Sequence, residues 1–236
     1  MSTFRRVSSW IHLYGGLALG GLLIVICVSG SALVFEDTLH EWLRPDLYHV
    51  STSGERASLD EVVDAVGQAY PEATPWIANL STAPTQPTVV RLGPEAPSVF
   101  VDPYRATVLG EQRPDEGLVN TIVGLHVELL AGRTGGVIVG ITGLLLVVLT
   151  ATGLVLWWPR RLKQLWDALR VSWREGGVRF NYDLHRAGGF YTTLFVLLTA
   201  LTGSAFIFYP TTQQLIATIT ATEPWPASPP TVAAEA

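Results

Sequence analysis

Residues 11–35 read IHLYGGLALGGLLIVICVSGSALVF and contain no Lys, Arg, Asp or Glu. Two later stretches, 135–158 and 188–209, are also free of charged residues and rich in Leu, Val, Ile and Gly. A helix needs about 20 apolar residues to cross a bilayer at about 1.5 Å per residue. Three such stretches in one chain predict an integral membrane protein with three transmembrane helices, which lies in a lipid bilayer.

The first stretch has one alternative interpretation, a cleaved secretory signal peptide. Arg5 and Arg6 would then form its basic end, and Ser29-Gly30-Ser31 its small-residue cleavage site. Residues 11–35 are longer than the apolar core of such a signal, which has about 7–15 residues. They also share a repeat with the third stretch, so a retained membrane helix is the favoured interpretation.

The composition of the 236-residue chain agrees with a membrane protein. Hydrophobic residues make up 48% and charged residues 15%, whereas about a quarter of an average soluble protein is charged. The net charge of −5 argues against a nucleic-acid partner. A single Cys permits neither an intramolecular disulfide nor a thiolate cluster. The motifs of nucleotide-driven enzymes and serine hydrolases are absent from the sequence.

Positive charge is concentrated on one side of the expected membrane. Arg5 and Arg6 precede the first stretch, and basic residues recur through 159–184, whereas residues 36–134 are acidic overall. Lys and Arg accumulate in cytoplasmic loops. We therefore expect the N-terminus and 159–184 to be cytoplasmic, and residues 36–134 and the C-terminus to lie outside, in the periplasm or its equivalent.

The segment between the first two stretches has the pattern of a small soluble domain. Ser58 and Glu61 form a capping-box pair that predicts a helix as far as Tyr70, where Pro71 follows. Pro and Gly clusters then separate short runs typical of strands. The expected strands are 75–81, 88–92, 98–101 and 107–109. One helix packed on a small antiparallel sheet is the simplest arrangement.

These patterns divide the chain into six parts. They are 1–35 (N-terminus and first transmembrane helix), 36–115 (periplasmic domain), 116–158 (amphipathic segment and second transmembrane helix), 159–184 (basic cytoplasmic loop), 185–209 (third transmembrane helix) and 210–236 (tail). The amphipathic segment 116–131 is either a helix at the outer membrane surface or an extension of the second span. We expect a disordered tail, because Pro, Ala and Ser dominate its end.

The first and third stretches are copies of each other. When His12 is aligned with His185, Gly15-Gly16 falls on Gly188-Gly189, and the same small-residue signature closes both stretches. Because both helices run from the inner to the outer side, we expect the two His to lie at the same depth near the inner face.

A membrane helix that begins with His and continues with paired glycines suits a haem site. An imidazole can ligate haem iron through one nitrogen, and glycines one turn later clear the same helix face for a flat macrocycle. The alternative is that the glycines serve close helix packing and that the His are interfacial anchors. Two His at matched depth, each with a matched glycine pair, favour haem b held by His12 and His185, with Gly15, Gly16, Gly188 and Gly189 around it.

A third His is associated with the second stretch. Thr152-Gly153 is a partial copy of the closing signature, but the nearest His, His126, lies on the outer side. We expect His126 to be a further candidate ligand, for a separate outer haem. His40 or His49 could supply its second ligand, but exposed loop residues are the favoured interpretation of both.

Six segments together carry a resemblance to a known family. They are Trp10-Ile11-His12-Leu13-Tyr14-Gly15-Gly16, Gly30-Ser31-Ala32-Leu33-Val34-Phe35, Val99-Phe100-Val101-Asp102-Pro103-Tyr104, Leu125-His126-Val127-Glu128-Leu129-Leu130-Ala131-Gly132, Thr152-Gly153-Leu154 with Trp157-Trp158-Pro159-Arg160, and Leu184-His185-Arg186-Ala187-Gly188-Gly189. This layout resembles the PepSY-associated transmembrane proteins, a bacterial inner-membrane family that includes iron-uptake-related proteins and ferric-siderophore reductases.

The resemblance implies a fold and an activity. The expected fold is an α-helical membrane bundle of three transmembrane helices, with a small α+β, PepSY-like extracytoplasmic domain between the first and second. The implied activity is haem-mediated electron transfer across the membrane. A ferric chelate in iron uptake is a candidate electron acceptor. Longer members have a fourth span that this chain lacks, so a second copy or a partner would complete the bundle. The alternative function is a non-catalytic membrane protein whose periplasmic domain binds or regulates a partner protein.

Overall fold

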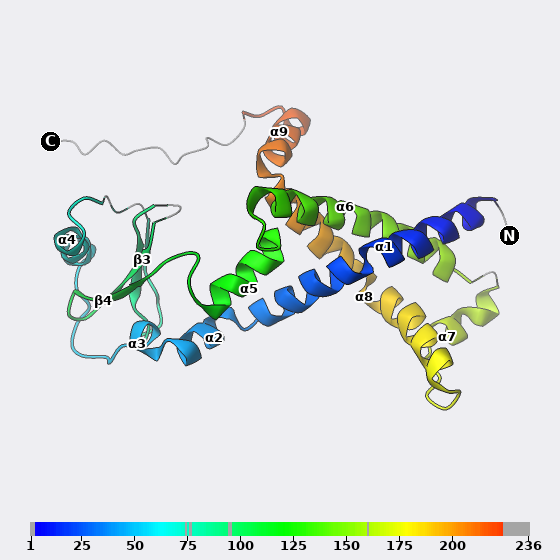
Figure 1. Ribbon diagram of the computed structural model, residues 1–236, viewed down its shortest axis with the longest axis horizontal. Coiled ribbons are helices and arrows are strands. Elements are labelled where there is room, and N and C mark those ends of the chain that lie inside the picture. Colours follow the sequence, from blue (N-terminus) through cyan, green and yellow to red (C-terminus); the bar gives the residue numbers. More distant parts are fainter. Residues whose placement is uncertain (1–2, 74, 76, 94–95, 160, 224–236) are drawn as a thin grey trace. The chain divides into compact units, whose positions relative to one another are not determined.

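The computed structural model describes residues 3–73, 75, 77–93, 96–159 and 161–223. The chain forms two compact units. The first contains Met1–Ile26 and Val127–Ala236, and the second contains Cys27–His126. Each unit is described by itself below, and Figure 1 gives the element labels.

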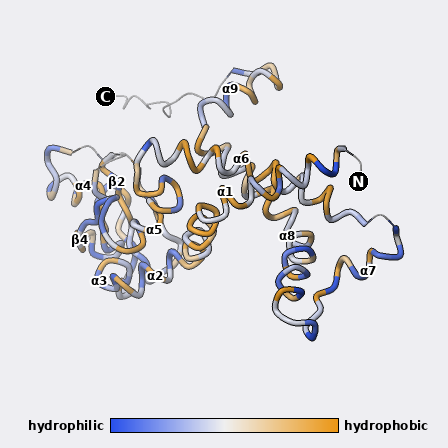
Figure 2. The backbone as a smooth tube through the Cα atoms, turned by 45° about the vertical axis from the view of Figure 1, so that its right-hand side comes forward, coloured by the Kyte–Doolittle hydropathy of each residue, from blue (hydrophilic) through white to orange (hydrophobic). Residues whose placement is uncertain are grey.

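Three helices of the described chain are long and apolar enough to cross a membrane. They are α1 (Thr3–Leu33), α6 (Gly132–Trp157) and α8 (Gly177–Ile207). Figure 2 shows hydrophobic positions recurring along each of them. Most of their large apolar side chains are exposed, as expected for surfaces that contact lipid rather than water. The predicted three spans are therefore confirmed.

Helices α6 and α8 pack side by side (Figure 1), and small residues permit the close approach. The Ser204 hydroxyl of α8 donates a hydrogen bond of 3.0 Å to the Gly140 carbonyl of α6. A Cβ placed on Gly143 would overlap Ser204, and one placed on Gly140 would come within 2.6 Å of the Phe208 ring. The contact follows the small-residue packing that replaces the hydrophobic effect between helices in lipid.

The amphipathic segment before α6 forms a helix of its own, α5 (Gly117–Glu128). Leu129 and Leu130 have φ values of +52° and +56°, and Gly132 has +56°. These left-handed residues break the helical path, so α5 is not a continuous extension of the second span. The other sequence-based alternative, a helix at the membrane surface, stays a prediction.

The third membrane helix begins earlier than the expected residue 185. Helix α8 starts at Gly177, and the segment before it contains a short 3₁₀ turn, η1 (Leu162–Gln164), and α7 (Leu165–Ala168). The segment expected as a basic cytoplasmic loop, 159–184, thus contains η1, α7 and the first turns of α8 among its described residues. An ion-pair network explains the early start of α8. In it, Asp183 pairs with Arg179 at 2.8 Å and with Arg186 at 3.1 Å, and both spacings suit a helix. Charges one turn apart stabilise a helix but end an apolar stretch.

The expectation of disorder after Tyr209 was also wrong for the part that the structure describes. Helix α9 spans Tyr209–Thr220. The prolines that suggested disorder lie at 224–230, outside the described residues, and Pro210 stands in the first helical turn. A proline is tolerated there because its missing N–H would have no intrahelical partner.

The second unit contains the predicted α+β domain. Helix α4 (Leu59–Ala69) begins with the expected capping box, in which the Ser58 hydroxyl accepts from the Glu61 backbone N–H. The sheet is antiparallel in the order β1 (Ile77–Asn79), β2 (Thr88–Arg91), β3 (Ser98–Asp102) and β4 (Thr107–Gln112). The core between helix and sheet consists of Val62, Val66, Val90, Val99 and Val101.

Two short helices precede this domain in the chain and pack onto it. They are α2 (Glu36–Leu43) and α3 (Pro45–Tyr48). Leu47 is 1% exposed, and the Tyr48 ring lies 4.8 Å from the Phe100 ring of β3, between ring centres. Phe100 alternates with Val99 and Val101 along β3, so residues 36–50 pack against the sheet outside the cluster of five valines.

Candidate cofactor site

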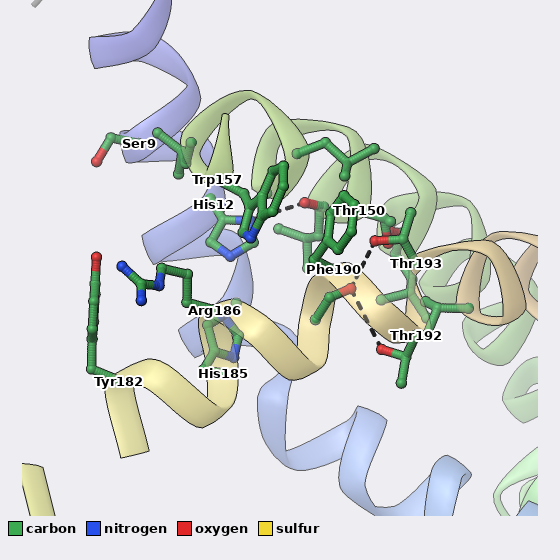
Figure 3. Close-up of a pocket in the computed structure, with 18 of the residues that line it drawn as sticks. Ser9, His12, Thr150, Trp157, Tyr182, His185, Arg186, Phe190, Thr192 and Thr193 are labelled. Atoms are coloured by element: carbon green, nitrogen blue, oxygen red, sulfur yellow. Dashed lines mark hydrogen bonds between the residues drawn. The ribbon is translucent and has the colours of Figure 1, made fainter. Parts of the chain in front are cut away.

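A cavity of about 740 Å³ lies among α1, α6 and α8, within the first unit. Its volume falls in the range of about 300–1,000 Å³ that is typical of small-molecule and cofactor sites. Figure 3 shows His12 and His185 in this cavity together with Trp157 and Phe190. The rings of Trp157 and Phe190 are stacked 3.8 Å apart and form one wall.

The structure brings His12 and His185 together in the cavity. Their ring centres lie 5.9 Å apart, with an angle of 59° between the ring planes. His12 is 12 − 3 = 9 residues from the start of α1, and His185 is 185 − 177 = 8 residues from the start of α8. At about 1.5 Å per residue, both lie about 12–14 Å along their helices.

The hydrogen bonds of His12 define its tautomer. Its Nδ1 lies 2.9 Å from the backbone carbonyl of Leu149 and 3.3 Å from the hydroxyl of Thr152, both on α6. A carbonyl oxygen can only accept, so Nδ1 must carry the hydrogen. The lone pair of the neutral ring is then on Nε2, which is the nitrogen that can ligate a metal.

The sequence-based reasoning missed Gly153 as a site residue. A Cβ at this position would lie 3.0 Å from Cε1 of His12, so the imidazole rests directly against α6. The small-residue signature at Thr152-Gly153 was recognised as a partial repeat, but its pairing with His12 depends on how two distant helices meet.

The four glycines predicted near the His play different parts. Gly16 and Gly189 line the cavity, and a Cβ on either would have no neighbour within 4 Å. Gly15 instead faces α6, where its Cβ would lie 2.9 Å from Leu149. Gly188 also faces open space but is not among the described residues that line the cavity. Of the four glycines, Gly16 and Gly189 are therefore the two that leave space for a ligand in the cavity.

Two cationic side chains, Arg5 and Arg186, are among the described residues that line the cavity. Arg5 donates hydrogen bonds to the carbonyls of Leu156 (2.8 Å) and Trp158 (3.0 Å) at the C-terminus of α6, where a cation is favoured by the helix dipole. Arg186 is paired with Asp183. A ligand in the cavity would meet these two cations as well as apolar side chains.

His126 belongs to the second unit, where it lies against the end of α1. Its Nδ1 is 3.4 Å from the hydroxyl of Ser29, and a Cβ on Gly30 would come within 2.6 Å of its Cε1. The contact repeats the arrangement of His12 on Thr152 and Gly153.

The two His considered as partners of His126 differ in their surroundings. His40 is 8% exposed, stacked on Tyr48 at 4.7 Å between ring centres and 3.9 Å from the Glu36 carboxylate. Its burial lowers its pKa from the ordinary value of 6.5. His49 is exposed. The expectation of an exposed loop residue therefore holds for His49 and is wrong for His40, which is packed inside the domain.

The residues of the cavity fit a haem group. If one metal ion were held between the two imidazoles at about 2 Å from each, their ring centres would be about 6 Å apart, and the observed distance is 5.9 Å. Among the described residues, no three of His, Cys, Asp and Glu gather at one point. A pair of imidazoles suits a macrocycle that brings its own equatorial ligands, and the open faces of Gly16 and Gly189 leave room for it.

The fold and the site together define a helical membrane protein with a cavity between its spans and a small α+β domain. A sequence model of the PepSY-associated TM region matches residues 9–236, so the chain belongs to that family. No curated protein matches the chain.

Proposed function

We propose that this protein binds haem b between His12 and His185 and passes electrons across a bacterial inner membrane. The observation that carries the proposal is the pair of imidazoles, 5.9 Å apart between ring centres, in a cavity of about 740 Å³. A haem bound in this way would supply reversible one-electron chemistry.

The protein's own residues have separable roles in this proposal. His12 and His185 would hold the haem iron, and the Leu149 carbonyl would keep His12 in the tautomer whose Nε2 can ligate. Gly16 and Gly189 leave space beside the helices. The stacked rings of Trp157 and Phe190 would form an apolar wall beside the haem, and Arg5 and Arg186, which also line the cavity, would be available to pair with its carboxylates.

The direction of transfer follows from the proposed topology. The positive charges of Arg5, Arg186 and the basic segment 159–184 favour a cytoplasmic location for this part of the first unit. The α+β domain, which we interpret as PepSY-like, would then be periplasmic. An acceptor on that side, such as a ferric chelate, would be reduced there. His126 is the candidate ligand for an outer haem that would carry the electron further.

Optical spectroscopy of the purified protein tests the proposal. Protein produced in cells with ample haem and purified in detergent should show a Soret band that sharpens and shifts on reduction. The apoprotein titrated with hemin should bind it stoichiometrically. A colourless protein that also fails to take up hemin would refute haem binding. It would favour the alternative, a non-catalytic membrane protein whose extracytoplasmic domain binds a partner protein.

A further inference from the structure

The contact between His12 and α6 is closer than ordinary helix packing requires. The imidazole lies over Gly153, where a Cβ would come within 3.0 Å of Cε1 and 3.5 Å of Nδ1. The distance to Cε1 is tighter than most Cβ contacts, whereas the distance to Nδ1 is an ordinary contact, so a residue larger than glycine would shift the ring slightly away from α6. Gly153 therefore controls where the ring of His12 can lie.

The residue before this glycine contacts the same ring. The Thr152 hydroxyl donates within its own helix, to the carbonyls of Val148 (3.0 Å) and Leu149 (2.9 Å), so toward His12 it can act as an acceptor. Nδ1–H is then shared between the Leu149 carbonyl and the Thr152 hydroxyl. Hydrogen bonds of this kind fix the orientation and raise the basicity of ligating imidazoles.

The same pair of residue types holds a second imidazole in the other unit. Ser29 and Gly30 contact His126 as Thr152 and Gly153 contact His12, with the hydroxyl near Nδ1 and the glycine beneath Cε1. The third copy of the signature, Thr202-Gly203 on α8, provides an internal contrast, because a Cβ on Gly203 has no neighbour within 4 Å.

We propose that a hydroxyl residue followed by glycine forms an imidazole seat, and that Thr152 and Gly153 are positioning residues for the haem ligand His12. The glycine lets the ring lie against the backbone of α6, and the hydroxyl, with the Leu149 carbonyl, keeps the hydrogen on Nδ1. The ligating nitrogen is thereby turned toward the cavity. This inference rests on the proposed haem function and adds residues to it that do not themselves touch the haem iron.

Gly153→Ala tests the steric part of the seat. The full-length apoprotein in detergent is titrated with hemin, and the low-spin ferric signal is recorded by electron paramagnetic resonance. We expect hemin affinity to fall by about 10- to 100-fold, the usual cost of disturbing the groups behind a metal ligand, and the g values to shift as the ring rotates. Gly203→Ala, at the same signature without a ring on it, should match the parent in both measurements.

Thr152→Val and Thr152→Ser test the hydrogen-bonding part and do not depend on the fate of Gly153→Ala. Loss of the acceptor in Thr152→Val should make the imidazole a weaker electron donor, so the midpoint potential of the haem should rise. Thr152→Ser keeps a hydroxyl and should restore the parental potential. If Thr152 had only a structural role, its replacement would change the stability of the protein but not raise the midpoint potential in Thr152→Val and restore it in Thr152→Ser.

Failure of this inference differs from failure of the haem assignment. If Gly153→Ala and Thr152→Val keep the parental hemin affinity, g values and midpoint potential while His12→Ala loses the haem, the seat is refuted and the function stands. If His12→Ala itself keeps the complete low-spin spectrum, the ligand assignment is refuted. If Gly153→Ala does not fold, as judged by gel filtration and circular dichroism, the midpoint potentials of Thr152→Val and Thr152→Ser test the proposal instead. Equal potentials in both variants and the parent would refute it.

Discussion

The rings of His12 and His185 lie 5.9 Å apart between their centres, although one residue is on the first membrane helix and the other on the third. Helix α6 explains the meeting. It holds His12 through the Leu149 carbonyl, and it packs along α8 through Gly140 and Gly143. The two copies of one motif thus converge on a cavity whose geometry depends on the helix between them in sequence.

Replacing either ligand should remove the same haem. We expect His12→Ala and His185→Ala each to lose the low-spin spectrum, because one remaining imidazole cannot supply both axial nitrogens. Haem content per protein and the reduced optical spectrum measure the effect. His49→Ala, an exposed His outside the cavity, is the control. If both variants retain the parental spectrum, His126 becomes the next candidate ligand.

Filling the open glycine faces should weaken haem binding without removing a ligand. Gly16→Leu or Gly189→Leu would place a side chain in the cavity that both residues line. Overpacking costs about 1–3 kcal/mol, which corresponds to roughly a ten- to hundredfold loss of affinity. A hemin titration measures it. Gly188→Leu faces open space without lining the cavity and should bind like the parent; equal affinity in all three variants would contradict the role of the glycines.

The close packing of α6 and α8 should depend on Gly143. The Cβ of Gly143→Ala would overlap Ser204 and approach the Ala200 carbonyl to 3.2 Å, so we expect a loss of about 1–3 kcal/mol of stability. Thermal unfolding in detergent followed by circular dichroism checks the effect. Gly136→Ala on the same helix meets only an ordinary contact of 3.8 Å and should leave the transition unchanged. A stable Gly143→Ala variant would mean that the helices do not approach this closely.

Reporter fusions test the proposed orientation. A reporter that is active only in the periplasm should be active after Pro103, in the turn between β3 and β4, and silent after Lys163, in η1. The physical reason is the accumulation of Lys and Arg on the side that is not translocated. A cytoplasmic reporter at the same two positions serves as the complementary control, and the reverse pattern would show the opposite topology.

The stability of the α+β domain should fall in mildly acidic solution because of His40. Burial lowers the folded-state pKa of His40 below its ordinary 6.5, so the unfolded state binds the proton more readily. The contribution of neutral His40 is complete above pH 6.5 and is lost as the pH falls through the folded pKa. Thermal unfolding of the parent at a series of pH values below 6.5 measures the decline. The dependence of the unfolding temperature on pH should become weaker in His40→Gln and stay as in the parent in His49→Ala.

Local signals made several elements predictable from the sequence. The membrane spans follow from charge-free length alone, and α4 follows from the pairing of Ser58 with Glu61. The helix boundaries were less accessible. The first turns of α8 carry Arg179 and Asp183, so the apolar stretch begins later in the sequence than the helix itself. Helix α9 contains too few apolar residues for a span, and the prolines beyond it masked its helical character.

The sequence by itself determined that His12 and His185 begin copies of one motif, because a repeat is visible without any structure. Only the tertiary structure decided that their rings meet in a cavity, that Gly15 packs on Leu149 while Gly16 faces the cavity, and that Gly153 supports His12. Adjacent glycines on a helix point about 100° apart, at 3.6 residues per turn, and look identical in sequence. Which of them faces a ligand and which a neighbouring helix depends on helix crossings, which are set by packing across the whole chain.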